Sequence, residues 1–150
     1  MPLIRSISLP LVARLTVAWG LLFAIVHFYW AAGGTAMNNG GATDTAAQAY
    51  IGLIAAIGLV SAAVGHGFVH DWGARLGRRR LALLARAGGA VLLLGVLGGV
   101  GRWLGDGGIG NDGASGVVIT AYFLVGGLLF SALGWRRAPI PHPAASRYGS

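Results

Sequence analysis

The 150-residue sequence contains no cysteine, no glutamate and no lysine. The missing cysteine excludes disulfides, thiol catalysis and metal sites built on thiolates. Only 4 acidic residues accompany 11 basic ones, and every basic residue is arginine. Charged residues make up 10% of the chain, whereas a soluble domain carries about 25%. So little charge cannot cover a surface in water, and we therefore expect the protein to lie in a lipid bilayer.

The hydrophobic residues, 55% of the chain, are concentrated in four long runs. A helix needs about 20 mostly apolar residues to cross a bilayer. Residues 11–32, 46–65, 81–104 and 116–135 meet this requirement. The sequence predicts an all-α fold, an integral membrane four-helix bundle that forms one domain over residues 1–150. The first run exceeds the roughly 7–15 apolar residues of a signal-peptide core, so we expect it to be a retained span.

Arginines gather on one side of this predicted topology. They precede or open the first run, fill the connection between the second and third, and follow the fourth: Arg5, Arg14, Arg75, Arg78, Arg79, Arg80, Arg136, Arg137 and Arg147. The other two connections contain Asp44, Asp106 and Asp112 but no basic residue. Cytoplasmic segments carry the excess of positive charge. We therefore predict that both termini, with a tail of residues 136–150, lie in the cytoplasm.

The composition and the small residues refine this prediction. Richness in arginine, glycine and alanine is typical of a bacterial source, and we expect a multi-pass protein of the bacterial cytoplasmic membrane. Small residues four positions apart let membrane helices approach closely. Gly95 and Gly99 form such a pair in the third run, and Gly58 and Ala62 form one in the second. Gly126 and Gly127 offer a similar contact point in the fourth.

The first run ends in the sequence HFYWAAGG, residues 27–34. At 100° per residue, Thr16, Trp19, Phe23, His27 and Trp30 share one helix face, which we expect to look toward the other helices. Ionisable side chains within a membrane are rare and usually functional, so His27 is a candidate functional residue. The alternative is a neutral histidine that hydrogen-bonds a neighbouring helix.

Other polar residues are predicted at the same depth as His27. Arg102 and Asp106 close the third run with the four-residue spacing of a helical ion pair. The candidates for binding a ligand on the outer side are His27, Trp30, Arg102, Asp106, Tyr50 and Tyr122. Tryptophan also anchors helices at membrane interfaces, and this role explains Trp30 as well as Trp72, Trp103 and Trp135.

The opposite side contains two histidines and most of the arginines. His66 and His70 are one helical turn apart, which makes them weak metal-ligand candidates, but zinc needs a third protein ligand and we predict no metal site. Haem bound to His27 would need a second axial ligand at the same depth, and the chain has none there. We therefore predict no cofactor, with haem or another pigment as a weaker alternative. Arg86 lies within the third run and can extend its guanidinium to the headgroups. We expect a basic collar for anionic lipids, formed by Arg75, Arg78, Arg79, Arg80 and Arg86.

Two stretches resemble a family of short bacterial membrane proteins known as domain of unknown function 3995. HFYWAAGG matches the end of that family's first span, and GRWLGD matches an Arg–x–x–Gly–Asp element that follows its third. The resemblance covers the layout of most of the chain and about a dozen motif residues. It implies a four-span architecture and draws attention to these positions. It implies no reaction, because the family has no established activity.

The absence of an acidic residue within any run, of a nucleophile beside a base and of a cofactor motif favours a non-catalytic protein. We predict an accessory or assembly subunit of a larger membrane complex, with a protein partner or a second copy. The alternative is an outward-facing binder or enzyme for a lipid, quinone or other amphiphile. In it His27 would move a proton, Arg102 would hold an anion and Asp106 would orient Arg102. The second alternative is a small oligomeric transporter or channel. Nucleic acid is not an expected partner, because no soluble basic domain is present to bind it.

Overall fold

The computed structural model describes residues 8–36, 44–105 and 113–135. These residues form α1 (Leu9–Ala31), α2 (Thr45–Gly67), the short α3 (Asp71–Leu76), α4 (Arg78–Gly105) and α5 (Gly113–Trp135). The segments long and apolar enough to cross a membrane are Leu9–Ala31, Thr45–Gly67, Arg78–Gly101 and Gly116–Trp135. The predicted all-α fold with four membrane-spanning helices is therefore confirmed. The α3 helix, which follows the second span, was not predicted.

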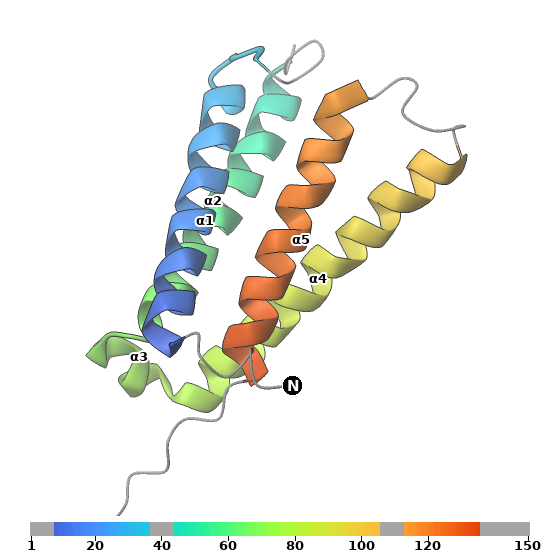
Figure 1. Cartoon of the computed structure of the whole chain (residues 1–150). Helices are drawn as coiled ribbons and strands as arrows, with labels where there is room; N and C mark the ends of the chain where they lie inside the picture. The colour runs from blue at the N-terminus through green and yellow to red at the C-terminus, as the bar shows by residue number, and fades with distance from the viewer. Residues whose placement is uncertain (1–7, 37–43, 106–112, 136–150) are drawn as a thin grey trace, which may run out of the picture.

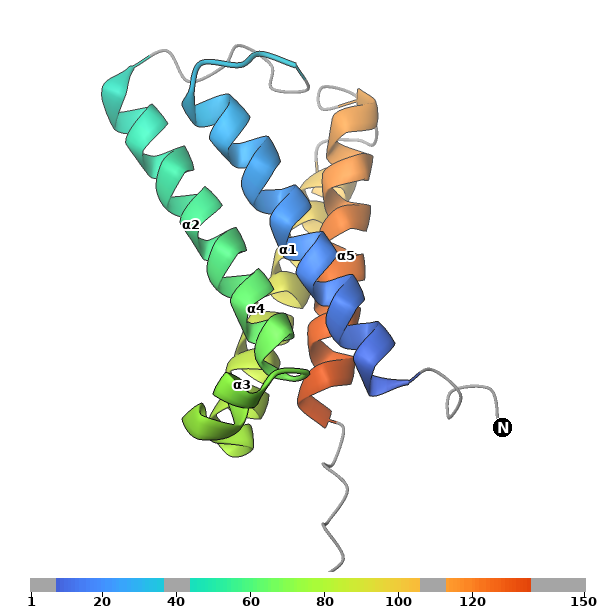
Figure 2. The ribbon, with the colours of Figure 1, turned by 90° about the vertical axis from the view of Figure 1, so that its left-hand side faces the viewer.

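The long helices form two antiparallel pairs, α1 with α2 and α4 with α5 (Figure 1). Contacts between α1 and α5 join the pairs, and Figure 2 shows α1 between α2 and α5. The start of α1, all of α3, the start of α4 and the end of α5 lie together at what we call the arginine-rich end. The opposite end, where α1 ends and α2 begins, is called the loop end. The described parts of the chain nearest to the two termini thus share one end of the bundle.

Side-chain caps mark where α1 and α2 begin. Ser8 accepts a hydrogen bond from the Leu11 amide at 3.4 Å, and Asp44 accepts one from the Ala47 amide at 2.7 Å. Such side chains satisfy backbone N–H groups that have no partner within the helix. Between α3 and α4 the chain turns at Gly77, whose φ of +94° is a conformation that glycine adopts readily. The connection between the two pairs is therefore a tight corner.

Small residues bring the backbones of α1 and α2 into contact. A Cβ atom added to Gly20 would lie 2.7 Å from the amide nitrogen of Ala62, and one added to Gly58 would lie 2.9 Å from the amide nitrogen of Ala24. The expected Gly58 and Ala62 pair therefore packs against a matching pair in α1, Gly20 and Ala24. Without a hydrophobic driving force between helices in lipid, such close contact is the main source of their association.

The α4 and α5 helices meet in a similar way, but side chains fill part of the space between them. A Cβ atom at Gly95 would lie 3.1 Å from the Phe123 ring, and one at Gly99 would lie 2.7 Å from the Thr120 hydroxyl. The predicted pair Gly95 and Gly99 therefore packs within the chain, against α5. Away from these contacts, large apolar side chains such as Val91, Leu94 and Leu104 are exposed, as a bilayer solvent requires.

We predict that Gly58→Ala destabilises the fold by about 1–3 kcal/mol, because the added methyl group forces the backbones of α1 and α2 apart. The measurement is reversible unfolding of the purified protein in mixed micelles, followed by circular dichroism. Gly52→Ala is the matched control, since it makes the same change in the same helix at a position with nothing within 4 Å of the new Cβ. Equal stability of the two variants would contradict the proposed contact.

Candidate functional site

Aromatic side chains of α1 and α5 form a column from the middle of the bundle toward the loop end. The Trp19 ring lies at its centre, stacked on Tyr122 with ring centroids 5.0 Å apart and on Phe23 at 5.4 Å. The edge of Phe130 meets Trp19 at 6.0 Å. Offset and edge-to-face aromatic pairs are favourable beyond the area that they bury. The column thus gives the interface between α1 and α5 a specific geometry.

Two hydrogen bonds cross the same interface in opposite directions. The Trp19 indole N–H donates to the Tyr122 carbonyl at 3.0 Å, and the Tyr122 hydroxyl donates to the Trp19 carbonyl at 2.5 Å. The Trp19 ring reaches α5 because Gly126 has no side chain, and a Cβ there would overlap the indole. Trp19 and Tyr122 thus satisfy the polar ends of both rings within the apolar core.

His27 continues the column toward the loop end. Its ring is half-buried, stacks on Phe23 at 4.0 Å and meets Trp30 at 4.9 Å in an edge-to-face contact. The Nδ1 atom lies 2.8 Å from the Phe23 carbonyl oxygen. Because a carbonyl only accepts, Nδ1 carries the hydrogen, and Nε2 is the nitrogen that remains for another partner. The hydrogen-bond partner is the preceding turn of α1 rather than a neighbouring helix.

The aromatic residues after His27 hold the segment in which α1 ends. The Trp30 indole N–H donates to the Ala36 carbonyl at 2.8 Å, and the Tyr29 hydroxyl accepts from the Ala36 amide at 3.4 Å. Gly34 lies directly against the Tyr29 ring, where a Cβ atom would overlap it. The polar atom of Trp30 is therefore engaged by the chain itself, which the sequence interpretation of Trp30 as a ligand-binding or anchoring residue did not foresee.

The remaining candidates on the outer side are separated. Tyr122 belongs to the aromatic column, whereas the Tyr50 side chain is 65% exposed on α2. Arg102 belongs to α4, but its side chain lies outside the described residues, and so does the whole of Asp106. The expected meeting of His27, Arg102 and Asp106 therefore stays a prediction.

At the arginine-rich end, His66 and His70 stack face to face with ring centroids 3.6 Å apart. The Trp72 indole N–H donates to His66 Nδ1 at 3.0 Å, and His70 Nδ1 lies 3.2 Å from the His66 carbonyl, to which it donates. One ring nitrogen of each histidine is thus already engaged, and parallel rings do not aim their other nitrogens at one point. Within the described residues, no group of three or more histidine, aspartate or glutamate side chains could hold a metal ion.

Arg86 connects α4 to the end of α5. Its Nε–H donates to the Gly134 carbonyl at 2.8 Å, and its guanidinium carbon lies 5.1 Å from the centre of the Trp135 ring. The last carbonyls of a helix have no partner within it, and arginine is a suitable donor to them. The side chain runs toward the arginine-rich end, as expected of a membrane arginine. The sequence interpretation missed its partners on α5.

The other arginines of the expected collar belong to different elements. Arg75 lies in α3, while Arg78, Arg79 and Arg80 form the first turn of α4. Arg78, Arg79 and Arg86 border a recess that Arg75 and Arg80 do not line. This recess also includes Phe68, the residue after α2, which the sequence interpretation did not single out.

No protein-family model, curated protein or solved structure matches this chain. The resemblance to domain of unknown function 3995 therefore stays a prediction.

We predict that Tyr122→Phe lowers the free energy of unfolding by about 1 kcal/mol, because it removes the hydrogen bond to the Trp19 carbonyl and keeps the ring. Denaturation in mixed micelles, monitored by tryptophan fluorescence, measures this change. The matched control is Tyr50→Phe, at an exposed tyrosine. If both variants were as stable as the wild type, the hydrogen bond across the interface would contribute nothing.

Proposed function

We propose that this protein is a non-catalytic accessory or assembly subunit of a larger membrane complex, which it joins through the exposed face of α4. The observation that carries this proposal is the pair Gly98 and Gly101. A Cβ atom added to either glycine would meet nothing within 4 Å, and although Gly52 of α2 is equally open, it is the one such glycine of its helix. Four other glycines of the same helix lie against α5: Gly88, Gly89, Gly95 and Gly99.

The two exposed glycines lie on the face of α4 that points away from α5. At 100° per residue, Val91 and Leu94 share this face, and their side chains are 68% and 65% exposed. In Figure 1 this half of α4 has α5 as its neighbour, while α1 and α2 lie farther away. Glycine lowers helix propensity, and in membrane helices it is useful where another backbone approaches. A transmembrane helix of a partner protein is the occupant that this surface suits.

A site for an amphiphile at His27 has less support in the described residues. His27 donates to its own helix, Trp30 donates to Ala36, and Tyr122 donates to Trp19. These are the contacts of residues that stabilise the fold, and Tyr50 lies apart from them on an exposed face. The exposed glycines of α4 therefore favour a docking subunit over an amphiphile site at His27.

We also propose that the arginine-rich end faces the cytoplasm of a bacterium and meets anionic lipids there. Arg75, Arg78, Arg79 and Arg80 lie at this end, and excess arginine marks cytoplasmic segments. Anionic lipids of the cytoplasmic leaflet attract such clusters. The described residues nearest to the two termini, Ser8 and Trp135, lie at this end, which supports a cytoplasmic place for both termini.

Affinity purification from native membranes tests the docking proposal. The tagged chain is expected to copurify with a second protein in a fixed ratio, measured by native mass spectrometry, and Gly98→Leu is expected to abolish this association by filling the approach surface. Gly52→Leu is the control, because it places the same side chain at an open position of α2. A wild-type chain that migrates alone, or a Gly98→Leu variant that keeps its partner, would contradict the proposal.

Single-cysteine labelling tests the orientation, since the native chain has no cysteine. Ala74→Cys in α3 and Thr35→Cys after α1 introduce thiols at exposed positions of opposite ends. In intact spheroplasts, a membrane-impermeant maleimide is expected to label the cysteine at position 35 and not the one at position 74. The reverse pattern would show that the arginine-rich end faces outward.

A further inference from the structure

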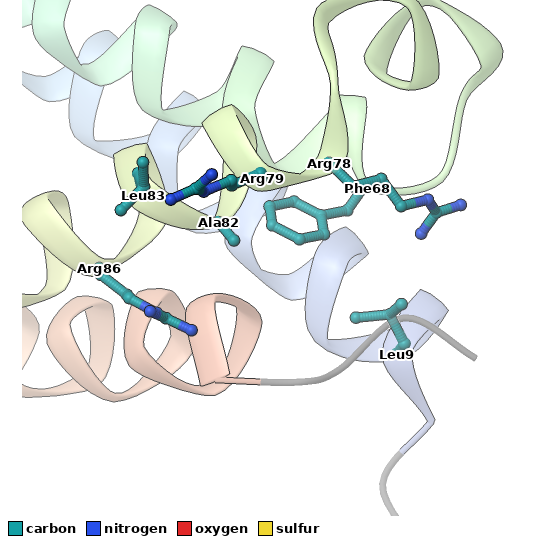
Figure 3. A pocket seen from close by; sticks show the side chains of 7 residues that line it. All are labelled: Leu9, Phe68, Arg78, Arg79, Ala82, Leu83 and Arg86. Atoms are coloured by element: carbon teal, nitrogen blue, oxygen red, sulfur yellow. The ribbon is translucent and has the colours of Figure 1, made fainter. Parts of the chain in front are cut away.

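The arginine-rich end contains a recess of about 370 Å³, within the range of small-ligand sites. It lies where the first turn of α1, the end of α2 and the first turns of α4 come together (Figure 3). Its lining residues come from three separate segments of the chain: Leu9, Phe68, Arg78, Arg79, Ala82, Leu83 and Arg86. The recess is therefore a product of the tertiary fold, and no single stretch of sequence encodes it.

The lining combines positive charge with apolar surface. Among the described residues, it includes three arginines and no acidic residue, and its remaining members are Leu9, Phe68, Ala82 and Leu83. The arginine side chains border the recess from different sides in Figure 3, with Phe68 between Arg78 and Ala82. Arg86 is fixed at the α5 side by its bond to the Gly134 carbonyl. A ligand that matches this lining is an anion with an apolar part.

The helix that supplies the arginines adds to the positive potential. Arg78 and Arg79 begin α4, and the first turn of α4 contains no acidic residue. The N-terminus of a helix carries a partial positive charge, so cations are unfavourable there and anions are favourable. Neighbouring arginines at this position repel one another and the helix dipole. An anion bound between them would remove this unfavourable interaction.

We propose that this recess binds the headgroup of one anionic phospholipid from the adjacent leaflet. The exposed side chains of Arg78 and Arg79 rotate to donate to the phosphate, a group that guanidinium recognises with paired hydrogen bonds. Arg86 adds positive charge from the α5 side. Leu9, Phe68 and Leu83 contact the glycerol and the first part of the acyl chains. A lipid is the suitable occupant, because the recess lies at an end of four membrane-spanning helices, at the depth of the headgroups.

This inference rests on the proposed contact between the arginine-rich end and anionic lipids, and it replaces a diffuse collar with one defined site. A collar attracts lipid in proportion to its total charge, so every arginine contributes alike. A site depends on the arginines that line it. Arg80 provides the comparison, because it is in the same helical turn as Arg78 and Arg79 but does not line the recess.

The experiment titrates phosphatidylglycerol, and separately phosphatidylcholine, into the full chain in a neutral detergent and counts bound lipids by native mass spectrometry. We expect the wild type to retain one phosphatidylglycerol in preference to phosphatidylcholine. The double variant Arg78→Gln/Arg79→Gln is expected to lose about tenfold or more in affinity, as the removal of charge-assisted hydrogen bonds predicts. Arg80→Gln is expected to change the affinity less than about twofold, since it loses only a screened, more distant charge. Circular dichroism checks that the variants fold.

Each other outcome overturns a different statement. The single variant Arg79→Gln, which removes one charge as Arg80→Gln does but from the lining, is measured beside it. A comparable loss in these two single variants would overturn the defined site and leave the collar. Equal retention of phosphatidylglycerol and phosphatidylcholine by the wild type would overturn both. Inorganic phosphate that displaces the lipid at equal concentration would show a site for free anions, and the lipid would no longer be the occupant.

Discussion

The reciprocal contact between Trp19 and Tyr122 is the interaction on which the arrangement of the two helix pairs depends. Each pair is held internally by close backbone contact, but the pairs themselves meet mainly along α1 and α5. At this seam each aromatic side chain donates to the backbone carbonyl of the other residue. Gly126 provides the space for the indole. A sliding of one pair against the other would break both hydrogen bonds and the stacking at the same time, so this contact fixes their relative position.

The same device, a side chain that donates to a backbone carbonyl, recurs at three other polar residues of the long helices. The Thr16 hydroxyl donates to Val12, His27 donates to Phe23, and the Arg86 guanidinium donates to Gly134. A carbonyl oxygen has two lone pairs, so those of Val12 and Phe23 accept a second hydrogen bond while the helical one remains, whereas Gly134 is among the last carbonyls of α5 and has no helical partner. Within the described residues, no buried side-chain nitrogen or oxygen is left without a partner. Polar side chains in this protein are therefore accommodated by the helices themselves, with little need for polar partners on other side chains.

Because polar side chains bond to backbone carbonyls, the sequence predicts the spans of this protein better than the partners of its polar groups. The four spans follow from the length and hydropathy of the apolar runs, and the packing role of Gly58 follows from its spacing to Ala62. The partners of a polar side chain do not follow, because every residue of a helix offers a carbonyl and composition does not distinguish one from another. Helical periodicity put Trp19 on an interior face, but only the tertiary fold shows that Gly126 lies opposite it. The recess beside Phe68 was beyond prediction for the same reason, since its lining comes from three segments that the corner at Gly77 helps to bring together.

The unequal surroundings of α4 connect the two proposed interactions. One face of this helix is packed on α5, and its first turns lie near the start of α1 and the end of α2. The face with Gly98 and Gly101 has no neighbour within the described chain. A lipid headgroup bound at Arg78 and Arg79 would neutralise the charged start of α4 at one membrane surface. A partner helix at Gly98 would contact the same helix nearer the other surface. Because the two positions are about 20 residues apart, or roughly 30 Å along a helix axis, both ligands can bind α4 at once without touching. A lipid that fixed the start of α4 would restrain the tilt of the whole helix, and the presentation of the glycine surface to a partner would depend on that tilt.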